Sequence, residues 1–423
     1  MKILYIIHQF FPEFYSGTEK FVYNVSSMTS LAGHKVEVLS YSFGDNVEYA
    51  DRLFDTLVKN TTYKKLSVVK IRNAGHEVEH HSLVTSTAGY KFACTFLYKH
   101  KPDIVHFGHT MRMFEFCYAA NSLDIPYCLT LTDFFLLCPK VNLITSSGAL
   151  CDGPCNGDNC RKLCPELGAE YIRTRLVLAR DSILRKASKL FAPSKFVADV
   201  FKQEIPELDI EIIGHGLVLD RESRSGIHNN SINDSVTFLY AGTFNRYKGP
   251  HVITDAVQRA RSNNIRLKIY GFGTDEEYFN ELIGMIDRDD RCEYCGSFNS
   301  EQIREIMAQV DAVVVPSLCY ETYSMIMHEA FQHGVPVIGS NLGGLAEKIA
   351  HGLNGYLVAP GDIDGLAKLI DEIALSPEKL QTLKNNIRKM IIPTVEQEAL
   401  AYERHYLHMH HGPEITRNEH RQL

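Results

Sequence analysis

Short apolar segments alternate with helical segments along this chain of 423 residues, and this alternation is the feature that most restricts its fold. Each apolar segment is only a few residues long, which suits a buried strand better than a helix. Buried strands separated by helices form a parallel sheet with helices on both faces. The first half contains predicted strands at residues 2–8, 35–39, 67–71, 104–107, 127–131 and 190–192, and predicted helices at residues 21–31 and 170–189.

A polar stretch near the middle separates two similar halves. Residues 218–234 are rich in Asn, Ser and charged side chains, which is typical of a linker. The alternation then restarts, with predicted strands at residues 236–241, 266–270, 312–315 and 335–339. Because a chain of this length needs more than one hydrophobic core, we predict two Rossmann-like α/β domains, at residues 1–217 and 235–394.

Composition and charge exclude several classes of protein. The chain is 45% hydrophobic and 22% charged, which is typical of a soluble globular protein. Its net charge of −7 argues against nucleic-acid binding, since that function favours a basic domain. The N-terminal apolar run is too short for a signal peptide, and no later run approaches 18 apolar residues. We therefore expect a cytoplasmic protein that does not bind nucleic acid.

Residues 315–330 carry the strongest functional signal. A predicted strand ends at Pro316-Ser317, a polar loop follows, and the next segment is helical and contains Glu321 and Glu329. A helix that begins at the carboxyl edge of a sheet presents free N–H groups and its positive dipole end, which favour a phosphate. Two glutamates eight positions apart can bind different hydroxyl groups of one extended ligand. They can equally be two solvated glutamates on a helix surface.

This pattern resembles the Glu-x7-Glu signature of retaining glycosyltransferases with the GT-B fold, the large family four in particular. The resemblance implies two Rossmann-like domains facing across a cleft, with residues 395–423 forming a helix that returns to the first domain. Further blocks that resemble this family occur in order over nearly the whole chain: Ser16-Gly17-Thr-Glu19, Gly33-His34-Lys-Val36, Gly242-Thr-Phe-Asn-Arg-Tyr-Lys248-Gly249, Gly271-Phe-Gly273 and Gly343-Gly344-Leu-Ala-Glu347.

The resemblance also implies roles for individual residues. Glu321 would contact the donor sugar, Glu329 the ribose and Lys248 the donor diphosphate. The family has an arginine where this chain has Thr243, and Arg246 is the candidate to replace it. No cofactor is required for transfer, because Lys248, helix dipoles and backbone amides can stabilise the leaving diphosphate. The other donor-binding positions that the resemblance implies are Gly17, Gly242, Gly271, Gly273, Phe298, Tyr323, Ser324 and Met325.

One departure from the family lies after the predicted strand at residues 127–131. The family often has Thr-x-His-Asp there, whereas this chain has Thr132 in place of the histidine and keeps Asp133. His109, at the end of the neighbouring strand, is the candidate to act with Asp133. We predict a retaining glycosyltransferase that moves a sugar from a nucleotide diphosphate sugar to a glycan or lipid-linked acceptor in polysaccharide biosynthesis. The alternative, motivated by Thr132 and Thr243, is a GT-B-like nucleotide-sugar-binding protein without turnover.

A cysteine-rich loop at residues 138–164 follows Asp133. Thiolates clustered in a loop with little core of its own suggest a structural zinc ion or an iron–sulfur cluster. The Cys-x2-Cys spacing usual for zinc is absent, so reduced thiols or redox-formed bridges remain an equal alternative. The candidate ligands are Cys138, Cys151, Cys155, Cys160 and Cys164.

The predicted helix at residues 170–189 has a basic face. Basic amphipathic helices can lie on an anionic membrane surface, although such a face is more often simply solvated. The lipid-linked acceptors of the family keep peripheral contact with the inner face of the membrane open as an alternative location. The basic residues are Arg173, Arg175, Arg180, Arg185, Lys186 and Lys189.

Overall fold

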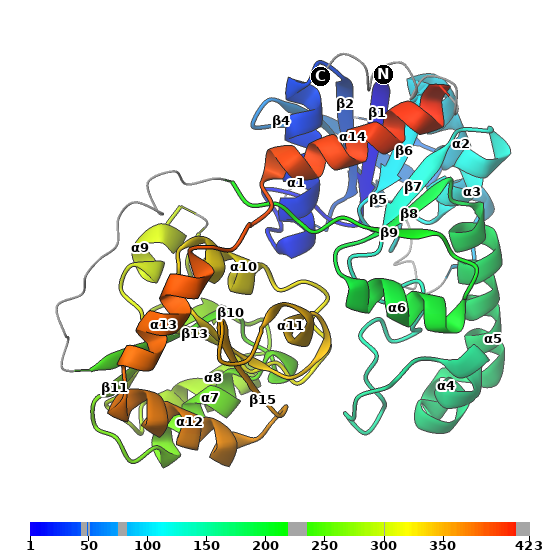
Figure 1. Cartoon of the computed structure of the whole chain (residues 1–423). Helices are drawn as coiled ribbons and strands as arrows, with labels where there is room; N and C mark the ends of the chain where they lie inside the picture. The colour runs from blue at the N-terminus through cyan, green and yellow to red at the C-terminus, as the bar shows by residue number, and fades with distance from the viewer. Residues whose placement is uncertain (44–48, 50, 75–82, 219–234, 300, 412–423) are drawn as a thin grey trace. The chain divides into compact units, whose positions relative to one another are not determined.

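The computed structural model describes residues 1–43, 49, 51–74, 83–218, 235–299 and 301–411, and these form two compact units (Figure 1). Unit 1 comprises Met1–Gly216 and Pro393–Leu423, and unit 2 comprises Leu217–Ile392. Most of the predicted linker, from residue 219 to residue 234, lies outside the described residues.

Unit 1 is built on a nine-stranded sheet with the order β3-β4-β5-β2-β1-β6-β7-β8-β9. In this order, all neighbouring strands from β5 across β2 and β1 to β9 pair in parallel, as the alternation of strands and helices predicts. The strands are β1 Lys2–Ile7, β2 Lys35–Tyr41, β3 Asp51–Leu53, β4 Thr56–Tyr63, β5 Leu66–Asn73, β6 Ile104–Phe107, β7 Tyr127–Thr130, β8 Lys189–Ala192 and β9 Ile210–Ile212.

Two features of unit 1 correct the sequence-based expectation. First, β3 and β4 pair antiparallel and extend the edge of the sheet. The side chains of β4 are mostly half-buried or exposed, so the strand lacks the apolar run by which the others were predicted. Second, the helix predicted at residues 170–189 ends early, because Lys189 pairs with Cys128 in the parallel sheet and the chain must leave the helix before it.

The helices of unit 1 connect these strands. The α5 helix is extended by a π-helical turn at Leu178–Ile183 and a short 3-10 turn at Leu184–Lys186. The α-helices are α1 Gly17–Leu31, α2 Thr87–His100, α3 Glu115–Ser122, α4 Asp158–Leu163, α5 Ala169–Val177, α6 Lys195–Glu204 and α14 Val395–His411.

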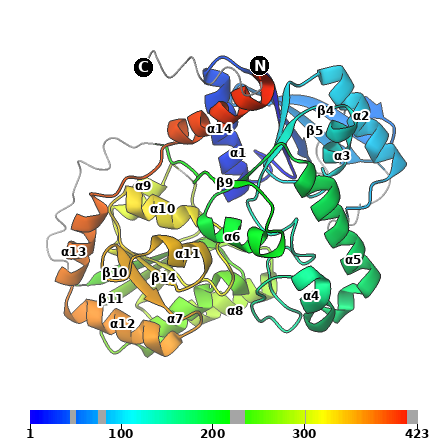
Figure 2. The same cartoon turned by 45° about the vertical axis from the view of Figure 1, so that its right-hand side comes forward.

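The C-terminal helix α14 belongs to unit 1 and lies along α1 (Figures 1 and 2). It is anchored by a buried polar network rather than by apolar contacts alone. The hydroxyl of Tyr406 lies 3.1 Å from the hydroxyl of Tyr5 and 2.6 Å from Nδ1 of His106. Nε2 of His106 lies 2.8 Å from Oγ1 of Thr130. Burial lowers the pKa of His106 to about 3, so this histidine is a neutral structural residue at neutral pH.

The chain leaves unit 1 and returns to it at one point. Gly216, the last residue of the first part, packs so closely on Thr394 that an added Cβ would lie 2.2 Å from the Thr394 carbonyl oxygen. Glu398 of α14 accepts a hydrogen bond from the N–H of Gly216 (2.7 Å) and binds Nδ1 of His215 (2.9 Å). The point at which the chain leaves unit 1 and the point at which it returns are therefore in direct contact.

Unit 2 contains a six-stranded, fully parallel sheet with the order β12-β11-β10-β13-β14-β15, the strand order of a Rossmann fold. The strands are β10 Val236–Thr243, β11 Ile265–Phe272, β12 Cys292–Tyr294, β13 Ala312–Val315, β14 Val337–Ser340 and β15 Gly355–Val358. The helices are α7 Pro250–Arg259, α8 Glu276–Ile286, α9 Ile303–Met307, α10 Met325–Gln332, α11 Gly343–Lys348, α12 Ile363–Leu375 and α13 Glu378–Ile387.

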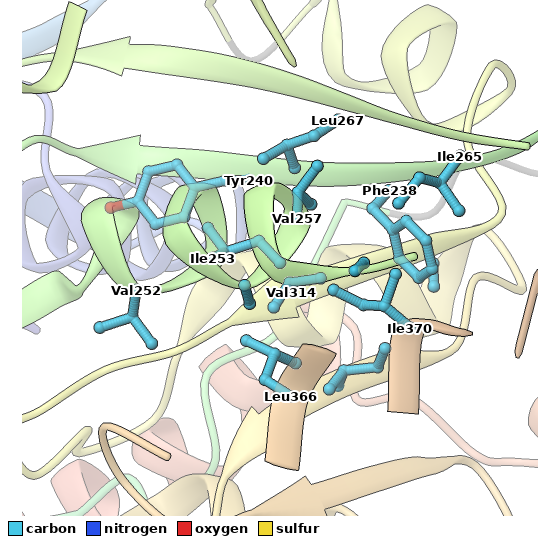
Figure 3. Close-up of a cluster of buried hydrophobic side chains, with 14 of the residues drawn as sticks. Phe238, Tyr240, Val252, Ile253, Val257, Ile265, Leu267, Val314, Leu366 and Ile370 are labelled. Atoms are coloured by element: carbon cyan, nitrogen blue, oxygen red, sulfur yellow. The ribbon is translucent and has the colours of Figure 1, made fainter. Parts of the chain in front are cut away.

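Each face of this sheet is covered by its own hydrophobic cluster. On one face, Phe238 of β10 packs with Ile253 of α7 and Ile370 of α12, each of them inaccessible to solvent (Figure 3). On the other face, α9, α10 and α11 contribute a second cluster that includes Met327 and Leu345. Full burial of such a side chain is worth about 1.5–3 kcal/mol, so the two clusters hold the strand ends rigidly in place.

Candidate functional site

In unit 2, two loops at the carboxyl edge of the sheet meet at Lys248 and Glu321. The loop after β10 contains a short 3-10 turn that ends at Lys248, and the loop after β13 carries Glu321. Gly249 makes this meeting possible: its φ is 70°, and an added Cβ would lie 2.2 Å from the carbonyl oxygen of Pro316. Only glycine combines this backbone conformation with so close an approach. The Nζ of Lys248 consequently lies 2.8 Å from Oε1 of Glu321.

The Lys248–Glu321 pair is an ion pair in a mostly buried setting. The side chain of Glu321 is 10% exposed and that of Lys248 is 37% exposed. Burial acts to raise the pKa of Glu321, but the charge of Lys248 and hydrogen bonds from Lys248 and Ser317 outweigh it and lower the pKa. Burial likewise acts to lower the pKa of Lys248, but the charge of Glu321 raises it overall. Both groups are therefore charged at neutral pH.

The hydrogen bonds at Glu321 leave part of its carboxylate available. Lys248 and the hydroxyl of Ser317 (2.6 Å) both donate to Oε1, so Oε2 is the oxygen that can accept from a ligand. Gly344 at the start of α11 donates its N–H to the backbone carbonyl of Glu321 at 2.7 Å, which fixes the loop from the other side. The sequence singled out Pro316-Ser317 as a strand end, but nothing in the pattern indicated that Ser317 would bind Glu321.

Helix α10 begins four residues after Glu321. Ser324 precedes it in the left-handed conformation (φ 61°), and Met325 is its first residue. Tyr323 is buried and its ring stacks on that of His328 at 3.8 Å, an interaction that the sequence did not reveal. Glu329 lies on the same helix and is also buried, so it is not the solvated surface residue of the alternative interpretation.

The other predicted donor-binding residues of unit 2 lie on or near the ends of β10 and β11. Gly242 and Gly271 are directly paired in the sheet. Phe298 packs edge-on against Tyr270, with ring centroids 6.1 Å apart. Arg246 begins the turn after β10, and its guanidinium binds Glu281 of α8. The remaining predicted positions, Thr243 and Gly273, end β10 and follow β11 respectively.

Unit 1 contains a second group of predicted residues, centred on His109 and Asp133. Nε2 of His109 lies 2.8 Å from Oδ2 of Asp133, and the N–H of Met111 donates to Nδ1 of His109 at 3.1 Å. Because Nδ1 accepts a hydrogen bond, the ring proton is on Nε2 and points to Asp133. Burial acts to raise the pKa of Asp133, but the electrostatic interaction and the hydrogen bond with His109 lower it. Asp133 therefore holds His109 in one tautomer and orientation.

These two residues line a pocket at the carboxyl ends of β6 and β7. The pocket is also lined by Thr132 and Phe135. Thr132 donates its hydroxyl to the carbonyl of Gly108 at 3.2 Å, so it does not replace the family histidine as a group directed at a ligand. His109 is the imidazole that reaches this pocket.

Gly17, the predicted phosphate-binding residue of unit 1, is the first residue of α1. The carboxylate of Glu19 accepts a hydrogen bond from the N–H of Ser16 at 2.6 Å and is also bound by the side-chain amide of Gln9. Glu19 is fully buried. Glu19 therefore caps the N-terminus of α1 and has a structural role.

The five predicted metal ligands divide into two groups. Cys138, Cys151, Cys160 and Cys164 are buried, whereas Cys155 is exposed, and all five are free thiols. Across the described ranges, no group of three or more His, Cys, Asp or Glu side chains is arranged to hold a metal ion.

The basic residues of α5 and of the segment that follows it mostly bind protein groups. Arg175 is buried and contacts the ring of Phe135. Arg180 binds Asp181, and Arg185 binds both Asp181 and Glu207. The basic face thus carries less free charge than the sequence indicates.

Hydropathy gives a separate result: in the part of the chain that the structure describes, no helix is both long and apolar enough to cross a membrane.

Comparison with known proteins finds a family match in the second half of the chain. Residues 223–390 match the family model described as Glycosyl transferases group 1. The chain is 26% identical over 211 residues to the lipopolysaccharide 1,2-N-acetylglucosaminetransferase of Salmonella typhimurium, covering 46% of this chain and 55% of that protein. It is 27% identical over 165 residues to the glycogen synthase of Mycobacterium tuberculosis, covering 38% and 40% respectively. The chain spans about half the length of the curated relatives that it matches.

Solved structures resemble the chain over nearly its whole length. HepE of Anabaena, in complex with UDP and glucose, has a TM-score of 0.68 at 19% identity and covers 96% of this chain and 99% of its own. WaaG, a glycosyltransferase involved in lipopolysaccharide biosynthesis, has a TM-score of 0.64 at 15% identity and covers 95% and 99%. The expected fold is confirmed: the chain has the GT-B fold, and residues 223–390 match the Glycosyl transferases group 1 model.

Proposed function

We propose that this protein is a retaining glycosyltransferase that moves a sugar from a nucleotide diphosphate sugar to a glycan or lipid-linked acceptor in polysaccharide biosynthesis. The observation that carries the proposal is the Lys248–Glu321 pair at the carboxyl edge of the unit 2 sheet. An ammonium group and a carboxylate fixed 2.8 Å apart can bind two adjacent parts of a ligand, one anionic and one rich in hydroxyl groups.

In this proposal the donor diphosphate binds at Lys248. The ammonium group has three N–H donors and uses one for Glu321, so it can bind a phosphate oxygen without giving up the ion pair. Negative charge develops on the diphosphate as the bond to the sugar breaks. A fixed positive charge at that position stabilises the transition state by several kcal/mol without requiring a divalent metal.

The sugar and ribose are assigned to the two glutamates. Oε2 of Glu321 accepts a hydroxyl of the donor sugar, and Glu329 on α10 binds the ribose. Helix α10, whose first residue is Met325, directs its N-terminal N–H groups toward the phosphates. A carboxylate accepts hydrogen bonds from hydroxyl groups, and these charge-assisted hydrogen bonds are stronger than those between neutral groups.

The His109–Asp133 pair of unit 1 is assigned to the reacting sugar or the acceptor. The imidazole donates its Nε2 proton to Asp133 and accepts from the N–H of Met111, so both of its nitrogens are used within the protein. The carboxylate of Asp133, which lines the same pocket, is therefore the group of this pair that we assign to accept a hydrogen bond from a ligand hydroxyl. The competing proposal, a nucleotide-sugar-binding protein without turnover, is supported by the orientation of Thr132 toward the backbone.

The first experiment measures donor binding and turnover separately. UDP-, GDP- and ADP-sugars are screened by thermal shift on the full chain, starting with UDP-glucose, with which HepE was solved. Lys248→Ala should abolish the shift, whereas Lys379→Ala, which removes an exposed lysine of α13 in the same unit, should preserve it. Hydrolysis of the donor or transfer of its sugar in Mg²⁺-free buffer would then support the proposal that the protein is an enzyme. A donor that binds but is never consumed with any acceptor tested favours the binding protein, and a normal shift with Lys248→Ala contradicts the site.

A further inference from the structure

Ser324, the residue before helix α10, holds a backbone conformation that serine rarely adopts. Its φ is 61°, and among the described residues of unit 2 it is the one non-glycine residue with a positive φ. Its own side chain does not compensate for this, because the hydroxyl makes no capping hydrogen bond to the helix. Such a conformation costs free energy and persists only where surrounding groups enforce it.

The side chain of His328, one turn further along α10, supplies this restraint. Its Nδ1 lies 3.0 Å from the backbone carbonyl oxygen of Ser324. Because a carbonyl oxygen can only accept, Nδ1 carries the proton and donates it. The backbone N–H of His328 reaches the same oxygen at 3.4 Å, which is longer than is usual for such a bond. The imidazole therefore makes the shorter of the two bonds to the strained residue.

The ring of Tyr323 holds this imidazole in position. The two rings are parallel, with an angle of 1° between them and centroids 3.8 Å apart. Both side chains are buried. Helix α10 is itself anchored, because Met327 is inaccessible to solvent within the second hydrophobic cluster of unit 2. Ser324 is therefore restrained by the residue before it and by the residue four positions after it.

Ser324 connects the two parts of the proposed donor site. Glu321 lies three residues before it, and Met325, the first residue of α10, directly follows. The loop is also fixed at its other end, where Gly344 donates its N–H to the carbonyl of Glu321 at 2.7 Å. Because both ends are fixed, the backbone of Ser324 decides how the chain runs between them. The bond from His328 therefore acts on the position of Glu321 relative to α10.

We propose that His328 is a positioning residue for the nucleotide diphosphate sugar: its Nδ1 bond to Ser324, together with the stacked ring of Tyr323, keeps the loop after β13 in the conformation that binds the donor. This inference rests on the proposed function and adds to its donor site a residue that the sequence pattern does not indicate. The imidazole touches no donor group and acts through the backbone of Ser324. A chain that populates the binding-competent conformation only in part binds more weakly by that fraction.

The test is a double-mutant cycle on the full chain, with UDP, GDP and ADP as probes and the tightest-binding one carried forward. His328→Leu removes the hydrogen bond and keeps an apolar side chain in the buried position. It should weaken nucleotide binding at least about fivefold by isothermal titration calorimetry, because Ser324 relaxes.

Two further variants separate positioning from packing. Ser324→Gly permits the same φ without restraint, because glycine adopts positive φ readily. When Ser324→Gly is already present, adding His328→Leu should therefore change the affinity by less than about twofold. His328→Asn, whose side-chain amide can donate in place of Nδ1, should retain most of the affinity that His328→Leu loses.

The matched control is His351→Leu. Nδ1 of His351 also bonds to the backbone, accepting from the N–H of Leu357 at 3.1 Å, and its ring packs edge-on against that of Tyr356 with centroids 5.3 Å apart. His351 precedes β15, so it lies at the opposite edge of the parallel sheet from Glu321. The control variant should leave nucleotide affinity unchanged, whatever it does to the melting temperature.

The outcomes separate this inference from the proposed function. If His328→Leu binds the nucleotide as tightly as the wild-type chain, or loses the same affinity with and without Ser324→Gly, the positioning role is overturned and the donor site stands. If His328→Leu does not fold, Tyr323→Leu takes its place in the cycle with the same expected cancellation. If the wild-type chain binds none of the three nucleotides, the proposed function fails first and this inference fails with it.

Discussion

Removal of Lys248 should convert Glu321 from a stabilising group into a destabilising one. Lys248→Met deletes the positive charge and keeps most of the side-chain volume. Removal of one partner from a fully buried ion pair costs roughly 3–5 kcal/mol. The Lys248 side chain is 37% exposed, so solvent can partly replace it at Glu321. Because of this screening, we expect the free energy of unfolding to fall by about 1–3 kcal/mol at neutral pH.

The pH dependence of this loss follows from the pKa of Glu321. In the wild-type chain that pKa is lowered, so the ionised carboxylate stabilises the fold above the pKa of an unfolded glutamate, and this contribution is lost as pH falls. Without Lys248, burial dominates and raises the pKa, so the ionised form destabilises the fold. The difference in stability between the two proteins should therefore be largest at neutral pH. It should shrink as pH falls, first through the raised pKa of Glu321 in the variant and then through its lowered pKa in the wild-type chain.

Urea-induced unfolding measures this directly when it is followed at about pH 7 and at about pH 3, above and below the ordinary glutamate pKa of about 4.3. The double variant Lys248→Met/Glu321→Gln should recover most of the loss at neutral pH, because the uncompensated charge is gone. Lys379→Met serves as the control. An equal loss at both pH values, or a double variant no more stable than the single one, would show that Lys248 acts by packing and refute the electrostatic argument.

Three further predictions follow from the geometry. Gly249→Ala should lower the free energy of unfolding by about 2–4 kcal/mol and abolish donor binding, because strain and overpacking both act at this position; thermal shift measures the two effects. Asp133→Asn should lower kcat/KM for transfer at least about tenfold without a large loss of stability, because His109 loses the carboxylate that orients it; unchanged kinetics would remove the pair from the site. Tyr406→Phe should cost about 1–3 kcal/mol in urea-induced unfolding, because it leaves buried His106 with an unpaired nitrogen, and a neutral result would contradict the importance of this network.

The sequence predicts those parts of the fold that depend on local pattern. Strands such as β10 and β13 are continuous apolar runs because both of their faces are buried, so they can be recognised without the structure. Strand β4, which lies next to the edge strand β3, has no such run because much of it faces solvent, and the sequence pattern does not predict it. The helix predicted at residues 170–189 was too long, because a long-range pairing of β8 with β7 decides where it ends.

The same difference between local pattern and long-range contact applies to the candidate site. The strand–loop–helix pattern placed Lys248 and Glu321 at the same edge of a sheet, but their direct contact joins residues 73 positions apart. Arg246 binds Glu281, a partner 35 positions away that no local pattern indicates, and its place beside the donor stays a prediction. Spacing could not separate Cys155 from the other cysteines of its loop, since exposure depends on the fold. Contacts between residues far apart in the chain therefore cannot be predicted from local sequence patterns.

The close packing of Gly216 on Thr394 has a consequence for the synthesis and engineering of the protein. Unit 2 is an insertion within unit 1, so the ribosome completes all of unit 2 before α14 exists to fill its place against α1. The docking of α14 on α1 can therefore occur only after all of unit 2 has been synthesised. Because the two ends of unit 1 already touch, excision of residues 217–392 with a direct splice should give an independent domain, whereas truncation at Ile392 should leave one that is incomplete.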